Sequence, residues 1–215
     1  PLRKVLAFSD RLESKYQGLL DETGQDYLNR MQGAVRRMQI LIDDLLAFSR
    51  VTSQARAFTR VDLSRVAAEV VSDLESRIEK SNGRVVIGPL PVIDADASQI
   101  HQLLQNLIGN ALKFHTADRT PVVKVSSEKI DENFCQINVA DNGIGFDMQY
   151  LDRIFKPFQR LFSRETYEGT GMGLAICRRI VERHSGTITA NASPGKGATF
   201  IIRLPIHQTM EHHKQ

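Results

Sequence analysis

The sequence predicts an α+β protein in which an N-terminal helical hairpin precedes a larger unit of mixed helices and strands. Two observations predict this class. Over roughly the first fifty residues, apolar side chains recur at alternating intervals of three and four, which is typical of a helix with one apolar face. After about residue 63, helical stretches alternate with short segments rich in β-branched and aromatic residues, which indicates mixed α and β structure.

Size and composition favour a soluble cytoplasmic protein of two domains. The chain has 215 residues, of which 41% are hydrophobic and 25% charged, and no apolar run is long enough to cross a bilayer. Its formal net charge of +3 is too small and scattered to favour nucleic acid, although it suits an anionic ligand. Cys135 and Cys177 lack paired spacing, which excludes a disulfide framework and suits a reducing compartment. We therefore expect no nucleic-acid partner and no direct membrane contact from this chain.

The first expected helix begins in "PLRKV", where Pro1 is compatible with a first helical turn. One face of this helix carries an apolar stripe formed by Leu2, Val5, Leu12, Tyr16 and Leu19, with Ser9 as its one polar member. A polar break, "DETGQ", separates it from a second helix. That helix repeats the same spacing at Leu28, Met31, Val35, Met38, Ile42 and Leu45.

Additional apolar residues widen the stripe of the second helix beyond what one partner helix can cover. They are Tyr27, Leu41, Leu46 and Phe48. Two hairpins that pack as a four-helix bundle would cover this surface, so the pattern favours a homodimer. An ordinary intramolecular hairpin is the alternative.

The small and polar stretch "FSRVTSQARAFTRVDL" indicates a hinge between the two domains. We expect the hairpin at 1–53, the hinge at 54–62, a second domain at 63–207 and a polar tail at 208–215. Helices of the second domain are expected at 63–80, 97–114 and 172–184, with a short one after Asp147. Its strands are expected at 85–87, 92–94, 122–127, 134–140, 187–191 and 199–204.

The segment "NLIGNALKFH" places Asn106, Asn110 and Lys113 on consecutive turns of one helix, so that the three side chains share a face. An Asn side chain offers a neutral oxygen to a hydrated magnesium ion, and a Lys supplies a point charge for phosphate. The trio therefore indicates a platform for a triphosphate and its metal. A solvated polar helix face explains the same pattern about as well.

The segment "DNGIGF" follows the alternating strand "CQINVA" directly, and its two glycines bracket Ile144. Such a turn lets the backbone approach a ligand closely. The carboxylate of Asp141, at the end of the strand, can accept a hydrogen bond from an exocyclic amine and so select adenine over guanine. A plain turn at the end of a hairpin is the alternative.

The segment "GTGMGLAI" is a glycine-rich loop that runs into a helix, whose free amides form an anion site. It is not the phosphate loop of the common nucleotide hydrolases, because the Lys-Ser/Thr pair is absent. Before it lies "IFKPFQRLFSRETYEG", which combines aromatic anchors with basic residues and indicates a mobile lid over an anionic ligand. The anchors and basic residues are Phe155, Phe158, Lys156, Arg160 and Arg164.

In chain order, the segments "NLIGNALKFH", "DNGIGF", "IFKPFQR" and "GTGMGLAI" resemble the N box, first glycine box, F box and second glycine box of sensor histidine kinases. The resemblance implies that 63–207 is a catalytic ATP-binding α/β sandwich of the GHKL type. It also implies that the hairpin is a dimerisation and phosphoacceptor-type domain, with "PLRKV" similar to the end of the H box. The acceptor histidine is then expected before residue 1. The style of "PLRKVLAFSDRL" is similar to kinases attached to PAS or phytochrome-like sensors.

The resemblance implies ATP and Mg²⁺ as cofactors, with Asn106, Asn110 and Lys113 as the catalytic group and Asn110 holding the metal through ATP. The ATP-binding residues that it implies are Asn106, Asn110, Lys113, Asp141, Gly143, Gly145, Lys156, Arg160, Gly169, Thr170, Gly171, Gly173, Leu174 and Thr199. The implied activity is transfer of the γ-phosphoryl group of ATP to a histidine and then to an aspartate of a response regulator. The implied partners are a second copy of the chain, a response-regulator receiver domain and an upstream sensor domain.

Alternatives are an ATP-binding signalling module that transfers no phosphate, a gyrase-type ATPase and an anti-sigma serine kinase. The wider superfamily of DNA gyrase and heat-shock chaperone ATPases has a water-activating glutamate at the position of Asn106, so this site should hold ATP without hydrolysing it quickly. The six histidines are expected to be structural or exposed, with His115 at the edge of the pocket. Autophosphorylation is therefore not expected from this chain alone.

Overall fold

The computed structural model describes residues 1–16, 18–54, 56–163, 166–167 and 169–208. It divides into two compact units, Pro1–Ala47 and Phe48–Gln215. The division lies ahead of the predicted hinge at 54–62, within the second helix. Of the predicted polar tail, residues after Gln208 lie outside the described residues, as does Arg164 of the predicted lid.

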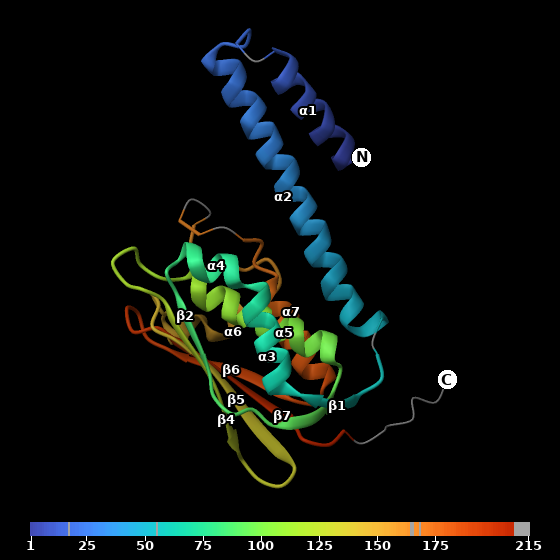
Figure 1. Cartoon of the computed structure of the whole chain (residues 1–215), viewed down its shortest axis with the longest axis vertical. Coiled ribbons are helices and arrows are strands. Elements are labelled where there is room, and N and C mark those ends of the chain that lie inside the picture. The colour runs from blue at the N-terminus through green and yellow to red at the C-terminus, as the bar shows by residue number, and fades with distance from the viewer. Residues whose placement is uncertain (17, 55, 164–165, 168, 209–215) are drawn as a thin grey trace. The chain divides into compact units, whose positions relative to one another are not determined.

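The first unit is a helical hairpin, as predicted, formed by α1 (Leu2–Tyr16) and the first part of α2 (Glu22–Ser53) (Figure 1). Leu28 and Val35 are buried in it, and Ser9, the polar member of the predicted stripe, is 1% exposed. The Ser9 hydroxyl donates to the Val5 carbonyl at 2.8 Å, which satisfies the buried hydroxyl within its own helix.

A polar contact also joins the two helices of the hairpin. The buried Gln32 amide on α2 donates to Asp10 at 3.2 Å and to Glu13 at 3.0 Å, both on α1. Hydrogen bonds from a buried amide to carboxylates depend on the pairing of the helices, so this contact favours one register of the hairpin.

Most of the predicted apolar stripe of α2 remains at the surface of the single chain. Leu28 and Val35 are covered, whereas the residues between and after them keep 41–52% of their surface. These exposed members are Met31, Met38, Ile42 and Leu45. A contiguous apolar surface of this kind on one helix is typical of a protein interface.

The second unit is built on a mixed five-stranded sheet with the order β2-β4-β5-β7-β6. β2 pairs parallel with β4, and the other neighbours pair antiparallel. The strands are β2 (Arg84–Ile87), β4 (Val122–Lys129), β5 (Phe134–Asp141), β6 (Thr187–Ala192) and β7 (Ala198–Pro205). A separate two-stranded antiparallel sheet joins β1 (Thr59–Asp62) to β3 (Val92–Ala95).

Helices cover one face of the five-stranded sheet, which makes the unit a two-layer α/β sandwich (Figure 1). The helices of this layer are α3 (Leu63–Asp73), α4 (Glu75–Lys80), α5 (Ala97–Lys113) and α7 (Gly173–Arg183). The central strand β5 alternates buried and half-buried side chains, because only one of its faces meets the helices. The fold class predicted from the sequence is confirmed.

Two details differ from the elements that the sequence predicts. The expected helix 63–80 is broken at Leu74, whose backbone (φ −95°, ψ 3°) ends α3 and starts α4. Periodicity hides this break, because Leu74 is buried in register with the apolar face of α3. The predicted hinge also contains β1, a strand too short to show an alternating pattern, with Val61 as its one buried residue.

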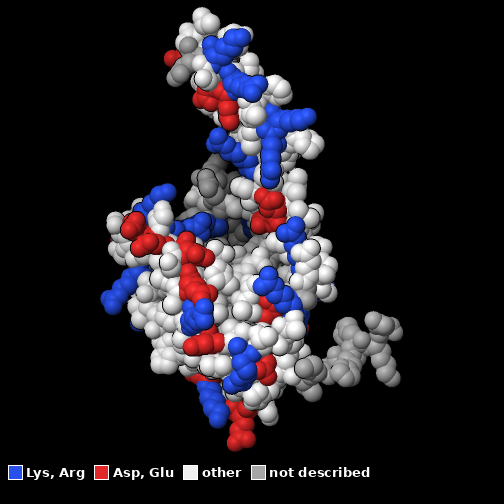
Figure 2. All heavy atoms as spheres, turned by 45° about the vertical axis from the view of Figure 1, so that its right-hand side comes forward, with Lys and Arg blue, Asp and Glu red and all other residues white. Residues whose placement is uncertain are grey.

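No described helix combines the length and apolar character needed to cross a membrane. On the face shown in Figure 2, basic and acidic side chains are interspersed rather than gathered by sign. A short 3₁₀ helix (Met148–Tyr150) and α6 (Leu151–Ile154) follow Asp147, where a short helix is expected.

Candidate functional site

The helix α5 carries the three polar residues that the sequence singles out. Asp96 caps its start, where the carboxylate accepts from the backbone amides of Ser98 and Gln99. One face of the helix carries buried core residues, among them Leu103, Leu104, Leu107 and Ile108. Asn106, Asn110 and Lys113 are half-buried, so they lie at the border of the core rather than on a fully solvated face.

The loop before α7 approaches these side chains closely. The Asn106 amide donates to the Gly173 carbonyl at 3.3 Å. A Cβ added at Gly173 would lie 3.8 Å from Asn106 and 4.0 Å from the Asn110 amide nitrogen. A Cβ added at Gly169 would lie 3.2 Å from the Lys113 ammonium. Two segments about sixty residues apart in the sequence therefore lie side by side in the structure.

The backbone of this loop requires glycine. Gly169 and Gly171 have φ of +138° and +81°, a region that residues with a Cβ rarely adopt. The backbone amide of Met172 donates to the Thr170 hydroxyl at 3.3 Å, and Gly173 is the first residue of α7. Leu174 is half-buried in the first turn of that helix. The loop thus presents backbone amides at a helix start, which suits an anionic group.

Asp141 lies at the end of β5 with its carboxylate half-enclosed. One oxygen accepts from the Gly143 amide at 2.8 Å and from the Ala198 amide at 3.1 Å. Burial raises the pKa of Asp141, and these two hydrogen bonds oppose the rise in part. Thr199, the next residue of β7 after Ala198, pairs with Ala140 in the sheet and is half-buried.

The first glycine box is packed against the end of α5. The Ile144 amide donates to the Phe114 carbonyl at 2.9 Å, and a Cβ added at Gly143 would overlap that carbonyl oxygen. Gly145 has φ +59°, and a Cβ there would overlap the Ser193 carbonyl. Phe114 therefore links the Asp141 loop to the helix that carries Asn110 and Lys113.

The predicted lid segment is joined to the second glycine box through Arg160. Its guanidinium donates to the carbonyls of Gly169 at 2.6 Å and Ser163 at 3.1 Å, and also to that of Tyr167. Arg160, predicted as an ATP-binding residue, thus supports the backbone of the loop that faces α5. Lys156 is exposed after α6, and the contacts of the described residues do not link it to α5.

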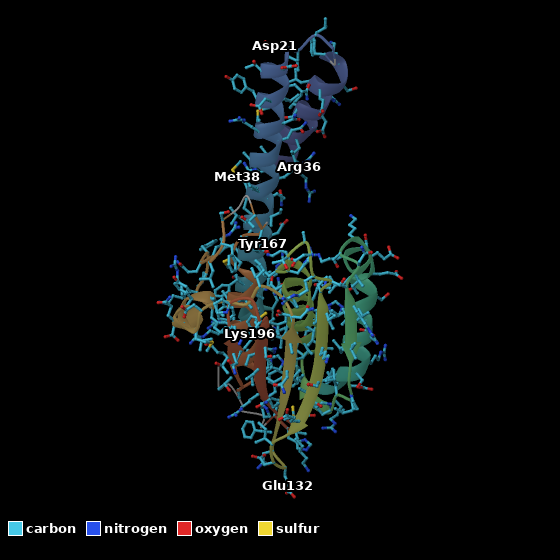
Figure 3. All side chains as sticks on the ribbon, turned by 90° about the vertical axis from the view of Figure 1, so that its left-hand side faces the viewer. Asp21, Arg36, Met38, Glu132, Tyr167 and Lys196 are labelled. Atoms are coloured by element: carbon cyan, nitrogen blue, oxygen red, sulfur yellow. The ribbon has the colours of Figure 1, made fainter. Side chains whose placement is uncertain are left out.

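An aromatic cluster that the sequence analysis missed packs over the end of α5. The ring of Phe114 lies 5.1 Å from that of Tyr167 and 5.9 Å from that of Phe162. The Lys113 ammonium lies 4.0 Å from the centre of the Phe114 ring, and the Tyr167 hydroxyl donates to the His115 carbonyl at 2.9 Å. Figure 3 shows Tyr167 at the opposite end of the second unit from Glu132, which lies in the β4–β5 turn.

The described residues contain no cluster of three His, Cys, Asp or Glu side chains able to hold a metal by themselves. A divalent cation at Asn110 would therefore depend on ligand oxygens and water for most of its coordination, which is how Mg²⁺ binds with nucleotides. The half-buried Asn110 amide lies near Gly173 of the glycine loop and the Lys113 ammonium near Gly169, which suits such a shared site.

The histidines of the second unit make contacts of the kinds expected for structural residues. His101 pairs with Asp73 at 3.0 Å, and His115 contacts the Leu112 carbonyl at 2.9 Å. His184 is fully buried, and His207 contacts Asp94 at 3.3 Å. His212 and His213 lie outside the described residues.

Comparison with known proteins agrees with this arrangement. The HATPase_c family model, described as histidine kinase-, DNA gyrase B- and HSP90-like ATPase, matches residues 95–208, and the HisKA model, the His Kinase A (phospho-acceptor) domain, matches 1–54. Phytochrome-like protein Cph1 of Synechocystis sp. is 40% identical over 206 residues, which are 96% of this chain and 27% of that protein. Sensor protein kinase WalK of Staphylococcus saprophyticus is 31% identical over 95% of this chain and 34% of that protein.

A solved structure with a similar fold is that of full-length ShkA in complex with AMPPNP. It matches with a TM-score of 0.72 and 27% identity, over 97% of this chain and 44% of that one. This chain therefore corresponds to a minor part of the length of each of these proteins. The matched parts include both the helical hairpin and the sandwich.

Proposed function

Since this chain belongs to the histidine kinase family, as its ATPase-type and His Kinase A-type segments show, we propose that it works as the ATP-dependent core of a protein-histidine kinase. In this proposal the second unit binds Mg·ATP. The γ-phosphoryl group passes to a histidine and then to an aspartate of a response regulator. The helical hairpin forms the dimer interface and the dock for that regulator.

The proposal rests mainly on one observation: the polar residues of α5 lie close to the glycine-rich loop that precedes α7. Asn106, Asn110 and Lys113 supply amides and an ammonium, and the glycine loop supplies backbone amides at the start of α7. Amide oxygen for a hydrated cation, a point charge for phosphate and free N–H groups for anions are together what a nucleotide triphosphate requires. ShkA was solved with AMPPNP, an ATP analogue, which supports the nucleotide assignment.

The chemistry assigned to this chain is positioning and charge stabilisation. Phosphoryl transfer depends mainly on holding the phosphates in line with the acceptor and on neutralising charge as it develops. Mg²⁺, when bound, neutralises phosphate charge. Lys113 adds a positive charge at the same place, and Asn106 offers an amide where a water-activating carboxylate would favour hydrolysis. The site is thus suited to holding ATP until a protein acceptor arrives.

The other assignments of the proposal rest on the same family membership. Asp141 selects adenine with the carboxylate oxygen that it does not use for Gly143 and Ala198, and Arg160 acts through the loop at Gly169. A second copy of the chain covers the exposed stripe of α2. An upstream sensor domain and a cytoplasmic location complete the assignment.

Calorimetric titration of the chain with AMPPNP, with and without Mg²⁺, tests the proposal. We expect saturable binding at one site per chain, tighter with Mg²⁺ and much weaker for GTP. A chain that binds no adenine nucleotide under either condition would overturn the assignment, whatever the activity of longer proteins. Equal affinity for ATP and GTP would remove Asp141 as the selecting residue.

A further inference from the structure

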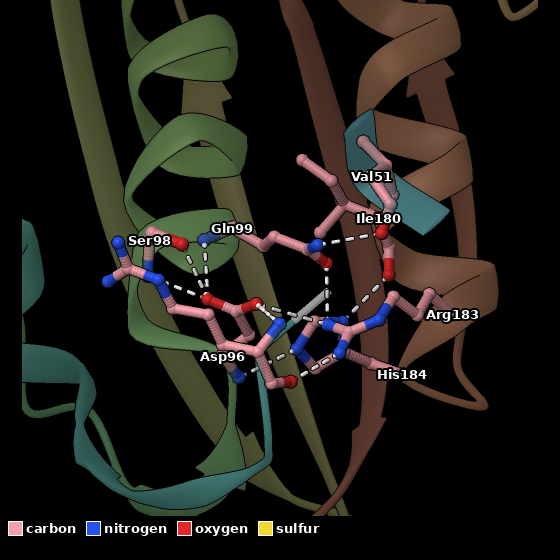
Figure 4. A network of polar contacts seen from close by, with 8 residues as sticks. Val51, Asp96, Ser98, Gln99, Ile180, Arg183 and His184 are labelled. Atoms are coloured by element: carbon pink, nitrogen blue, oxygen red, sulfur yellow. Dashed lines mark hydrogen bonds and ion pairs between the residues drawn. The ribbon is translucent and has the colours of Figure 1, made fainter. Parts of the chain in front are cut away.

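A set of polar contacts binds the last turn of α2 and the segment after it to the start of α5 and the end of α7 (Figure 4). We refer to this set as the linker latch. On the side of the helical layer it consists of Asp96, Gln99, Arg183 and His184, and on the side of the linker it consists of Val51, Arg56 and Phe58. All of these residues belong to the second compact unit.

Gln99 bridges the linker and α7. Its side-chain amide donates to the Val51 carbonyl at 2.8 Å, and its side-chain oxygen accepts from Arg183 at 2.9 Å. Gln99 and Val51 are both almost fully buried, at 6% and 2% exposure. A buried amide with both ends bonded is costly to leave unpaired, so this bridge favours the docked linker.

Arg183 and Asp96 both bind the backbone of Arg56, one at its carbonyl and the other at its amide. The guanidinium of Arg183 donates to the Arg56 carbonyl, and the carboxylate of Asp96 accepts from the Arg56 amide at 3.1 Å. Arg183 also pairs with Asp96 at 3.3 Å and lies 4.7 Å from the centre of the Phe58 ring. Although burial raises the pKa of Asp96, hydrogen bonds from Ser98, Arg56 and Gln99 and the charge of Arg183 lower it overall.

His184 completes the latch in its neutral form. Its Nε2 accepts from the Asp96 backbone amide at 3.1 Å, and its Nδ1 lies 2.8 Å from the Ile180 carbonyl, which can only accept. These partners select the tautomer with the proton on Nδ1. The Phe58 ring packs against the imidazole at a centroid distance of 4.8 Å, tilted by 44°, and the charged groups near the imidazole are Arg183 and Asp96.

A second proton on His184 would break this arrangement. Protonated Nε2 is a donor, and it would face another donor, the Asp96 amide. Burial lowers the pKa of His184, the hydrogen bond to Ile180 raises it, and the nearby charges of Arg183 and Asp96 act in opposite directions. The neutral ring is therefore favoured in the closed latch, and exposure of the ring on opening would favour protonation.

The latch is separate from the nucleotide site. Asp96 caps the start of α5, whereas Asn110 lies fourteen residues further along it, or about 21 Å at the rise of an α-helix. Helix capping alone does not explain the contacts, because the cap uses the amides of Ser98 and Gln99 while the remaining groups bind the linker.

We propose that the linker latch is a conformational switch that fixes Val51, Arg56 and Phe58 on α5 and α7 at neutral pH and releases them when His184 is protonated. Release frees the chain segment that leads to the hairpin, whereas the nucleotide site is unchanged. A few side chains of α5 and α7 then determine whether the end of α2 and the segment after it are bound or released.

Hydrogen exchange on the whole chain tests the switch through the segment 51–58. We compare Arg183→Gln with Arg178→Gln, a change of the same kind on the same helix at an exposed pair with Glu182. Loss of the charged hydrogen bonds of Arg183 should speed exchange of the Arg56 amide by about ten- to hundredfold, whereas Arg178→Gln should leave it unchanged. Equal protection of 51–58 in the two variants would overturn the latch.

A second variant, together with nucleotide affinity, distinguishes local release of the linker from general unfolding. Gln99→Glu keeps an acceptor for Arg183 but removes the donor to the Val51 carbonyl, so it should also release the segment. AMPPNP affinity should stay within about twofold in each variant, since the two sites are far apart. Release with unchanged affinity supports the switch, and release accompanied by loss of nucleotide binding would show unfolding and count against it.

The role of His184 is tested by comparing amide hydrogen exchange at pH 7.5 and pH 5.5, with the rates normalised to those of an unstructured peptide at each pH. Because the pKa of His184 is lowered in the closed state, closure is favoured above the usual histidine pKa of about 6.5 and is lost as pH falls below it. The wild-type chain and the control His101→Gln should both lose protection of 51–58 at pH 5.5. Unchanged protection in the wild type, or a response that His101→Gln abolishes, would overturn the role of His184.

Discussion

Asp141 is a partly enclosed carboxylate with two backbone hydrogen bonds. Its environment is poorly hydrated, which raises its pKa, and one of its oxygens is committed to the Gly143 and Ala198 amides. Since the folded-state pKa is raised, the protonated form is the stabilising one, and that contribution is lost as pH rises through the raised value. The ionised form at neutral pH is therefore held at a cost in stability, as is common for functional carboxylates.

Substitution of Asp141 by Asn should separate affinity from stability. The variant keeps an oxygen for the two amides but loses the charged acceptor for the adenine amine, so ATP affinity should fall about ten- to a hundredfold. Its melting temperature at pH 8 should equal or exceed that of the wild type, because the buried charge is gone. Calorimetry and thermal unfolding, with the exposed Asp147→Asn as the matched control, measure both effects. Unchanged affinity would exclude Asp141 from base recognition.

Asn110 is expected to carry the magnesium dependence of nucleotide binding. In Asn110→Ala the amide oxygen is lost, so AMPPNP affinity should become nearly the same with and without Mg²⁺. The matched control is Gln105→Ala, which removes an amide from the exposed side of the same helix. If the Asn110 variant still responds to Mg²⁺ as the wild type does, the metal ligand lies elsewhere.

The residues of the candidate site were predictable from the sequence to different degrees. Asn106, Asn110 and Lys113 could be predicted because helical spacing places them on one face, and Gly169 and Gly171 because their glycine-rich run indicates unusual backbone. The aromatic contacts of Phe114 with Tyr167 could not be predicted in this way, since the two residues are more than fifty positions apart and no periodicity relates them. The support that Arg160 gives to the loop was hidden for the same reason.

At the scale of elements, the helices α1 and α2 leave an incomplete core. Within the single hairpin α2 buries Leu28 and Val35, but Met38 keeps 44% of its surface exposed. Helices with such a stripe gain most of their stability by packing it against another helix. This packing is the physical basis for the proposed dimer.

A charge at Met38 should therefore weaken association of the chain. Met38→Glu places a carboxylate in the stripe, and dimer affinity should fall by at least about a hundredfold, because an unpaired charge would be desolvated at the interface. Light scattering of the wild type and variant over a micromolar concentration series measures the change. The control Gln39→Glu lies beside it on α2, where the half-buried side chain donates to the exposed Asp43 at 3.0 Å. A wild-type chain that stays monomeric would contradict the bundle.

Element boundaries were the part of the fold that sequence patterns predicted least well. The break at Leu74 involves no Gly or Pro, and the buried leucine continues the apolar spacing of α3. β1 holds one buried residue, Val61, and depends on pairing with β3 more than on its own pattern. Both features arise from tertiary packing, which overrides local propensity.

At the scale of the whole molecule, the division into a hairpin and an α/β sandwich could be predicted, but the strand order could not. β2 pairs parallel with β4 across the intervening β3 and α5, so the sheet order departs from the order in sequence. Such long-range pairing is determined by how the helices cover the sheet. The same limit concealed the linker latch, whose members come from three separate segments: the linker, the start of α5 and the end of α7.

Nucleotide binding and phosphoryl transfer should be separable in this chain. None of its six histidines lies in α1 or α2, so after incubation with labelled Mg·ATP we expect bound nucleotide but no acid-labile phosphate on the chain. Mass spectrometry at neutral pH measures this outcome. Phosphate on His101, His115 or His184 would contradict the expectation that these histidines are structural or exposed.

The two cysteines give the molecule a practical property. Cys135 and Cys177 are buried, and burial raises the pKa of both thiols, that of Cys177 to about 12. Because the thiolate is the reactive form, neither should be alkylated while the fold is intact. A single cysteine introduced at the exposed Lys196 or Tyr27 would then take a spin label or fluorophore alone. The wild-type chain is thus a thiol-silent background in which distances between its two units are open to spectroscopy.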